Sequence, residues 1–335
     1  MVQVIRVERK ASVLTPSQLA CLSHVPTINL TAGCAHECLY CYARGYSGHP
    51  GRGRVVLFAN TLEKLRQELP RKRKRPAAVY FSPSCDAFQP VPEVLDLAYE
   101  VFAFLLRRGI GVAVLTKGRI PDRHMGLLRA NAPLVHAGIG LTTLDRHVWE
   151  TFEPWTAAPD VRVAQVRDLV RAGIDTQVRL DPILPGVTDG EGTLDDVFAT
   201  LAGLGVRDAA VSTAFMRPRI VRTLRRDVRD KVMASALLSH YVSGPTLTMK
   251  GAGTALLVPP VETRRGIYRR VRRIAARHGV GVRVCACKNG DLAVGSCHIA
   301  GRWDRPRRAQ AQGELFAAET PSDAPGDPEV VVERT

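Results

Sequence analysis

The sequence has no long apolar run. No stretch of its 335 residues approaches the ~18 consecutive apolar residues that a membrane-spanning helix requires. Residues 1–6 also lack the apolar core of a signal peptide. We therefore expect a cytoplasmic protein with no membrane partner. In a reducing compartment, the eight cysteines are better explained as metal-bound thiols than as disulfides.

Acidic side chains are few: 32 stand against 47 lysines and arginines, which gives a formal net charge of +15. Several of the acids are concentrated in residues 317–335, so the rest of the chain is more basic still. Such an excess attracts polyanions, and we expect nucleic acid, DNA first, as the partner. The basic side chains are densest in residues 71–75, 217–229 and 264–273. One such run by itself is more often a solvated surface than a binding site.

Three cysteines stand close together with no fourth cysteine nearby. Cys34, Cys38 and Cys41 are separated by three and then two residues, and Tyr40 precedes the last of them. Three thiolates can hold three irons of a cubane iron–sulfur cluster, which leaves the fourth iron open for a ligand. The alternative is a zinc knuckle completed by His36 or by a distant ligand, although zinc sites usually contain paired Cys-x2-Cys units.

A second group of potential metal ligands lies further along the chain. Cys285, Cys287 and Cys297 are followed by His298. Packing alone is a poor explanation for so many ligands in so short a segment. The group predicts an auxiliary iron–sulfur cluster, completed by His298, Cys21 or a substrate atom, or else a zinc site. Unpaired reduced cysteines are the remaining alternative.

Strand-like and helix-like segments alternate along the chain. Apolar, β-branched segments predict six strands, at residues 27–30, 77–81, 111–116, 134–141, 176–180 and 208–213. Segments of helical periodicity, several closed by a glycine, predict helices at residues 61–69, 91–108, 122–131, 161–172 and 194–204. A further helix at 268–278 and a strand at 281–284 precede the second group of ligands. Alternation of this kind produces parallel strands with right-handed crossovers, so we predict an α/β fold with a six-stranded partial barrel.

The predicted elements divide the chain into four parts. Residues 25–215 form the partial barrel, and residues 1–24 precede it as an N-terminal extension. Residues 216–303 form a C-terminal extension that contains the second group of ligands. Residues 304–335 have too little apolar content to bury, and we expect a disordered tail.

Polar residues, prolines and glycines follow four successive predicted strands. They occur at residues 82–90, 116–119, 140–143 and 179–186. Chemistry in α/β barrels is located at the C-terminal ends of the strands, where loops can vary without disturbing the core. The three clustered cysteines follow the first strand, so all these segments are expected to meet at one active-site rim.

The order of these motifs resembles a known family. Beyond the clustered cysteines, the likeness rests on residues 40–42, 86–90, 115–117, 142–145 with 152–154, and 181–189. The cysteine spacing resembles the cluster loop of the radical S-adenosylmethionine (SAM) superfamily. The succession of motifs resembles the spore photoproduct lyase-like group of that superfamily, whose members are often described as DNA-repair photolyases. The likeness covers about residues 25–215 and implies a radical SAM barrel.

The resemblance also implies cofactors and roles. It implies a [4Fe–4S] cluster whose open iron binds SAM, generation of a 5′-deoxyadenosyl radical, and an electron donor such as flavodoxin or ferredoxin. By analogy with the lyase, Cys85 is predicted to be a catalytic thiol that donates hydrogen to the product radical; a small packing residue is the alternative. On the expected rim, we predict that the cofactor is bound by Tyr40, Ser82, Asp86, Lys117, Thr142 and Arg179.

Within residues 304–335, a short segment resembles the pentapeptide by which bacterial repair and replication proteins dock on the sliding clamp. It consists of residues 312–316 and includes Gln312, Leu315 and Phe316. A glutamine and a terminal Leu-Phe pair can fill small apolar clefts when a flexible segment becomes ordered. The resemblance therefore implies a sliding clamp as a further partner.

Two classes of function follow from the sequence. The first is a radical SAM enzyme, lyase-like or modifying, that repairs a DNA lesion or modifies a base. The second is a radical SAM enzyme that modifies a peptide or protein, for which an auxiliary cluster is the usual companion. A non-enzymatic iron–sulfur sensor is a more distant third.

Overall fold

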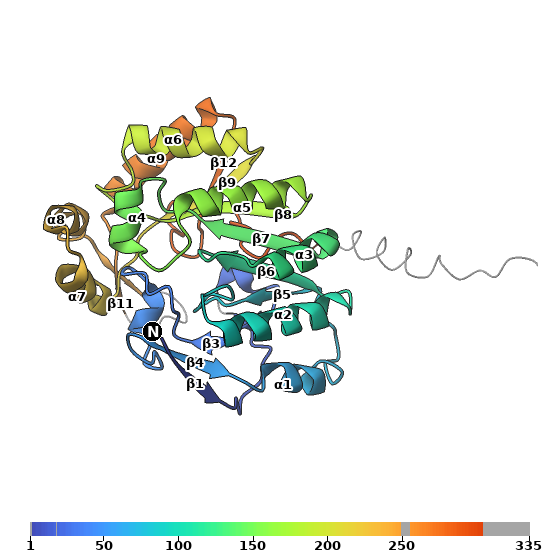
Figure 1. Cartoon of the computed structure of the whole chain (residues 1–335). Helices are drawn as coiled ribbons and strands as arrows, with labels where there is room; N and C mark the ends of the chain where they lie inside the picture. Colours follow the sequence, from blue (N-terminus) through green and yellow to red (C-terminus); the bar gives the residue numbers. More distant parts are fainter. Residues whose placement is uncertain (1, 18, 249–254, 304–335) are drawn as a thin grey trace, which may run out of the picture. The chain divides into compact units, whose positions relative to one another are not determined.

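A parallel β-sheet forms the centre of the molecule (Figure 1). The structure is a computed structural model and describes residues 2–17, 19–248 and 255–303. The strand order is β12-β9-β8-β7-β6-β5-β2, and every neighbouring pair is parallel. The strands are β2 (Thr27–Ile28), β5 (Ala78–Phe81), β6 (Gly111–Thr116), β7 (Val135–Gly140), β8 (Asp175–Ile183), β9 (Asp208–Thr213) and β12 (Gly281–Val284).

The six strands predicted for the barrel are confirmed, and the strand predicted at 281–284 adds to the same sheet as β12. The sheet therefore has one strand more than the predicted barrel. Its central strands are mostly buried, and every residue of β5 and β7 is buried. Burial on both faces explains why these strands are recognisable as short apolar runs in the sequence. In the described chain the two edge strands, β12 and β2, do not pair with each other, so the barrel is open.

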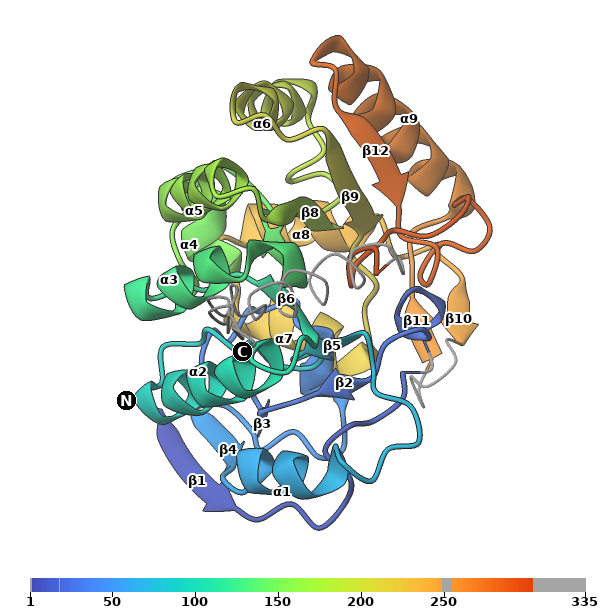
Figure 2. The same cartoon turned by 90° about the vertical axis from the view of Figure 1, so that its right-hand side faces the viewer.

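Helices cover the outer side of the curved sheet (Figure 2). In α2, the buried residues Val94, Leu97, Ala98 and Val101 recur at helical spacing and form the face that packs on the sheet. The covering helices are α1 (Thr61–Glu68), α2 (Pro92–Leu106), α3 (Asp122–Ala130), α5 (Pro159–Arg171), α6 (Glu191–Gly203) and α9 (Val261–Arg277). All six correspond to predicted helices, with α9 beginning earlier than expected.

A second, three-stranded sheet lies beside the first and was not predicted. Its central strand β4 (Arg54–Phe58) pairs in parallel with β1 (Gln3–Val7) and antiparallel with β3 (Thr31–Ala32). This sheet ties the N-terminal extension to the segment that leads into the clustered cysteines. The remaining elements are η1 (Ala20–Leu22), η2 (Tyr42–Gly45), η3 (Ala132–Leu134), α4 (Arg146–Phe152), α7 (Pro218–Asp227), α8 (Lys231–Ser239), β10 (Thr246–Thr248) and β11 (Ala255–Leu257).

The chain divides into two units, Met1–Arg302 and Trp303–Thr335. The first unit contains the two sheets described above, the antiparallel pair of β10 and β11, and the segments that we separated at residues 24 and 215. The predicted disordered tail, with Gln312, Leu315 and Phe316, lies outside the described residues. Among the described helices, none combines the length and the apolar character that a membrane crossing requires.

Candidate cofactor site

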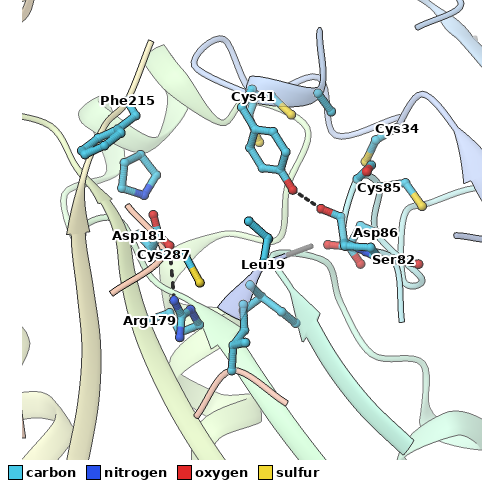
Figure 3. Close-up of a pocket in the computed structure, with 18 of the residues that line it drawn as sticks. Leu19, Cys34, Cys41, Ser82, Cys85, Asp86, Arg179, Asp181, Phe215 and Cys287 are labelled. Carbon is cyan, nitrogen blue, oxygen red and sulfur yellow. Dashed lines mark hydrogen bonds and ion pairs between the residues drawn. The ribbon is translucent and has the colours of Figure 1, made fainter. Parts of the chain in front are cut away.

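One cavity collects all eight cysteines of the chain. It has a volume of about 490 Å³ and lies at the C-terminal ends of the strands. Cys34, Cys41 and Cys85 lie on one side of it, and Cys287 lies on the other (Figure 3). All eight cysteines are free thiols. The cavity therefore joins the two groups of potential ligands that the sequence places far apart.

The loop that carries the motif cysteines, defined as Cys34, Cys38 and Cys41, begins at a required glycine. Gly33 has φ +80°, and a Cβ atom there would approach the carbonyl oxygen of Arg54 to 2.7 Å. The loop directly follows β3, so the second sheet fixes its start. This is the local reason why the sequence needs glycine immediately before the first motif cysteine.

Hydrogen bonds from three other segments hold the loop in place. The side-chain oxygen of Gln89, which is fully buried, accepts a bond of 2.8 Å from the backbone N–H of Ala35. The backbone N–H of Leu39 donates to the carbonyl oxygen of Phe152 at 3.0 Å. Arg44 donates to the carbonyl oxygen of Cys38 at 3.1 Å. The backbone of the loop is thus held by contacts with the rest of the fold.

Three free thiols on one preorganised loop fit a cubane cluster with one open iron. In the described chain, no group of three or more Cys, His, Asp or Glu side chains is arranged as a single metal ion would need. Cys34, Cys38 and Cys41 are the residues that would hold such a cluster.

Lys117 connects the motif loop to a buried polar network. Its ammonium group donates to Tyr40 Oη at 2.7 Å, to Thr142 Oγ1 at 2.8 Å and to Glu153 Oε1 at 2.8 Å. Burial lowers the pKa of Lys117 to about 8. Glu153 is fully buried, and burial raises its pKa although Arg162 opposes the shift. The network gives this side of the cavity a fixed cation next to the motif cysteines.

Asp86 joins the ends of two strands. Its carboxylate accepts bonds from Thr116 Oγ1 at 2.8 Å, from the backbone N–H of Lys117 at 2.9 Å and from that of Phe88 at 2.8 Å, and it lies 3.3 Å from His36 Nε2. Burial works against ionisation, but the His36 ring and the backbone donors outweigh it and lower the pKa of Asp86. The carboxylate therefore stays ionised and holds the cavity wall together.

The structure distributes the predicted cofactor-binding residues unevenly. Tyr40, Ser82, Asp86, Lys117 and Arg179 line the cavity. Thr142, although described, is not part of the lining; it lies behind Lys117, where its hydroxyl contacts Glu153.

Two predicted residues have surroundings of particular interest. Ser82 is buried at the end of β5 in a left-handed conformation, with φ 57°. Cys85 is half-buried, and its sulfur lies 3.6 Å from Asn29 Oδ1. Burial raises the pKa of Cys85, so the residue remains a protonated thiol at the cavity wall. Its predicted role as a hydrogen donor stays a prediction.

The far side of the cavity contains four cysteines rather than three. Cys21 lies in η1, and its backbone N–H donates to the sulfur of Cys287 at 3.2 Å. Cys285 and Cys297 pack against Cys21 in the same apolar cluster. We call Cys21, Cys285, Cys287 and Cys297 the four-cysteine group. Arg179, predicted to bind the cofactor, interacts electrostatically with Cys297 and Cys285 and therefore belongs to this side.

Sequence reasoning missed several residues that build the site. Gln89 and Glu153 were seen only as parts of motifs, and Arg162 and Lys288 were not singled out. Arg162 has no local signal, because it acts as the partner of a carboxylate on another element. Lys288 could have been suspected from its place directly after Cys287. It pairs with Asp181 at 2.5 Å.

A partial barrel with a three-cysteine loop after its first strand defines an enzyme class that uses an iron–sulfur cluster with one open iron. A family model described as the Radical SAM superfamily matches residues 28–198, which is half of the chain. The chain belongs to the radical SAM superfamily. Membership implies a [4Fe–4S] cluster and SAM as cofactors.

Three comparisons extend this assignment. An uncharacterised protein of Mycobacterium tuberculosis is 28% identical over 200 residues, which are 57% of this chain and 59% of that protein. A radical SAM Nα-GlyT isomerase of Pseudomonas phage M6 is 28% identical over 176 residues, which are 51% of this chain and 35% of the isomerase. The chain thus spans less than two thirds of these relatives.

The third comparison is structural. A mutant spore photoproduct lyase with bound AdoMet and dinucleoside spore photoproduct has a TM-score of 0.64 and 14% identity, with coverage of 84% of this chain and 81% of the lyase. The predicted resemblance to spore photoproduct lyase is confirmed at the level of the fold.

Proposed function

We propose that this protein is a radical SAM enzyme that acts on nucleic acid, DNA first, to repair a lesion or modify a base. The observation that carries the proposal is a second cavity of about 240 Å³ whose lining is dominated by arginines. It shares Arg44 and His49 with the cysteine-lined cavity, so the two adjoin. Its other charged lining residues are Arg52, Arg219, Arg222 and Arg226.

The charge of this arginine-lined cavity is only partly neutralised from within the protein. Arg52 pairs with Glu37 at 3.2 Å, and Arg226 pairs with Asp227 at 2.6 Å. Arg219 and Arg222 are exposed on α7 and have no ion-pair partner among the described residues. Free guanidinium groups next to an active-site mouth are suited to bind backbone phosphates.

The other two basic runs are less suitable. In α9, Arg264 pairs with Asp291, Arg270 with Asp189 and Arg273 with Glu191, so much of that charge is used within the fold. Residues 71–75 precede β5, which puts them near the N-terminal ends of the parallel strands, whereas the cavity lies at the C-terminal ends. The run on α7 is the one that adjoins the site.

The chemistry follows from the superfamily. The motif cysteines would hold the cluster, which when bound and reduced would supply the electron for cleavage of SAM to methionine and a 5′-deoxyadenosyl radical. Lys117 presents an ammonium group where an anionic part of the cofactor can bind, and Tyr40 and Glu153 keep it in place. Asp86 keeps the strand ends fixed, and Cys85 offers a protonated thiol to the same cavity as the predicted hydrogen donor.

The likeness to spore photoproduct lyase supports this proposal by analogy. The dinucleoside spore photoproduct is bound in the structure of the lyase, not in that of this protein. Free thiols suit a reducing compartment, so we propose a cytoplasmic location. We also propose flavodoxin or ferredoxin as the electron donor, and a sliding clamp as a partner of Gln312, Leu315 and Phe316.

DNA binding measured against salt concentration tests the proposal. Each phosphate contact contributes roughly 0.7–0.9 to the slope of log affinity against log salt. In an Arg219→Gln/Arg222→Gln protein, the magnitude of this slope should fall by roughly 0.7–0.9 for each phosphate contact removed. The matched control is Arg269→Gln/Arg272→Gln, which changes two exposed arginines at the same spacing on α9. Absence of DNA binding even at low salt would overturn the nucleic-acid assignment.

A second candidate is a radical SAM enzyme that modifies a peptide or protein. The observation that favours it is the additional cysteine group opposite the motif cysteines, because Cys285, Cys287 and Cys297 could hold the auxiliary iron–sulfur cluster that is usual in such enzymes. The same salt titration separates the two candidates. Loss of all DNA binding together with an intact auxiliary centre would favour the peptide substrate.

A further inference from the structure

We propose that Cys21, Cys285, Cys287 and Cys297 bind a second [4Fe–4S] cluster in which every iron has a protein ligand. The sequence leaves the fourth ligand open between His298, Cys21 and a substrate atom. The inference is independent of the substrate, because it concerns only how these four thiols are brought together.

The four-cysteine group forms where the two edges of the open barrel approach each other. Cys21 precedes the edge strand β2, whereas Cys285 directly follows the other edge strand, β12. The thiol of Cys21 interacts with those of Cys285, Cys287 and Cys297, and Cys285 interacts with Cys287 and Cys297 as well. Segments separated by more than 260 residues in the sequence therefore supply one compact set of sulfur ligands.

Two of the four ligands, Cys285 and Cys297, are held through their backbone groups by contacts with the rest of the fold. The N–H of Cys285 donates to the carbonyl oxygen of Val211 in β9 at 2.9 Å. The carbonyl oxygen of Cys285 accepts from Asn289 Nδ2 at 3.1 Å, and that of Cys297 accepts from Gln177 Nε2 at 3.0 Å. Asn289 and Gln177 are buried side chains, so the loop is held by the interior of the barrel. Supporting contacts of this kind are typical of built metal sites.

The charges around the group suit an anionic cluster. Arg179 is 1% exposed, and its Nε atom has no hydrogen-bond partner among the described residues. Lys288 follows the ligand Cys287 and interacts electrostatically with Cys285. A cluster with four thiolate ligands carries net negative charge, and hydrogen bonds to its sulfurs are a usual means of stabilisation. The backbone N–H of Cys21, which already points at the sulfur of Cys287, is one such donor.

His298 is a poorer candidate for the fourth ligand. His298 is a described residue but does not line the cavity. It interacts electrostatically with Arg302, Arg283 and Asp208. Cys21 completes the set without a substrate atom, so no iron of this cluster is open. The two centres therefore differ in kind: the motif cysteines leave one iron for SAM, and the four-cysteine group leaves none.

The experiment compares metal content after anaerobic reconstitution. Wild-type protein should contain twice the iron and sulfide of a Cys34→Ala/Cys38→Ala/Cys41→Ala protein, in which the four-cysteine group is unchanged. A Cys21→Ala/Cys297→Ala protein should also contain half the wild-type amount. Cys85→Ala is the matched control, because Cys85 is the one cysteine outside both groups, and it should contain the full amount.

Electron paramagnetic resonance of the reduced proteins supplies a readout besides activity. SAM should change the signal of the Cys21→Ala/Cys297→Ala protein, and it should leave the signal of the triple variant unchanged. A triple variant that is folded by circular dichroism but contains no iron would overturn the proposal. Stoichiometric zinc in that variant would overturn the iron assignment. A Cys21→Ala protein with full iron and a SAM-insensitive second signal would remove Cys21 from the ligand set.

Discussion

The buried pair of Arg162 and Glu153 offers a sharp test of how the cavity is supported. Both side chains are fully buried and form an ion pair. Arg162 also donates to the carbonyl oxygens of Gly140 at 2.7 Å and Ala157 at 2.8 Å, and to Thr156 Oγ1 at 3.1 Å. We consider Arg162→Met, which keeps much of the side-chain volume and removes the charge and every donor.

The cost of this substitution can be worked from the contacts. Removal of one partner from a buried ion pair costs about 3–5 kcal/mol, because an uncompensated charge remains. Lys117 still contacts the Glu153 carboxylate at 2.8 Å, which reduces the penalty. The carbonyl oxygens that lose a donor add about 1 kcal/mol each when they stay unsatisfied. We therefore expect a loss of about 3–5 kcal/mol in the free energy of unfolding.

Denaturant unfolding under anaerobic conditions, followed by circular dichroism, measures this loss. Arg129→Met is the matched control, because Arg129 pairs with Asp168 at 3.6 Å on the surface, with about half of each side chain exposed. It should cost no more than about 1 kcal/mol. A loss for Arg162→Met as small as that of the control would refute the reasoning.

Four further results are expected. Replacement of all three motif cysteines by alanine should abolish formation of 5′-deoxyadenosine, measured by chromatography; residual cleavage would contradict their assignment. Cys85→Ala should leave SAM cleavage intact but lower the product yield, and an unchanged yield would reduce Cys85 to a packing residue. Deletion of residues 304–335 should leave DNA binding and SAM cleavage unchanged and should abolish binding to a sliding clamp in a pull-down. Unchanged clamp binding would show that residues 312–316 are not a docking motif. Burial lowers the pKa of His124, so only the unfolded chain gains this proton just below the ordinary histidine pKa of about 6.5, and the free energy of unfolding should fall there as the pH drops. His124→Gln should flatten that part of a plot of the urea midpoint against pH. An unchanged plot would exclude the mechanism.

Much of the barrel could be predicted because its signals are local. Each main strand is a short apolar run, and each covering helix has its own periodicity, so neither depends on distant residues. The second sheet lacked such a signal. Its strands β1 and β4 pair across about 50 residues, and β3 has two residues, so only the pairing defines it. The short helices α4, α7 and α8 were missed too, and α7 was visible only as a basic run.

The site was predictable to the extent that spacing encodes it. The motif cysteines lie within one loop, and their spacing was sufficient. For Cys285, Cys287 and Cys297, the sequence left the fourth ligand open between His298, Cys21 and a substrate atom, because no spacing rule connects Cys21 to Cys285. The roles of Arg162 and Gln89 were also out of reach. Gln89 contacts a segment 54 residues away in the sequence, and Arg162 pairs with a carboxylate on another element. The arginine runs can be read from the sequence. Only the fold shows that arginines of α7 line a cavity, whereas several arginines of α9 form ion pairs within the protein.

The position of Cys21 imposes an order on the maturation of the protein. During synthesis the motif cysteines leave the ribosome soon after Cys21, whereas Cys285, Cys287 and Cys297 follow near the end of the chain. A scaffold protein that delivers iron and sulfide can therefore serve the motif loop early, but the four-cysteine group is complete only after β12 has docked beside β9. Until that moment Cys21 lacks the three thiols with which it would share a cluster.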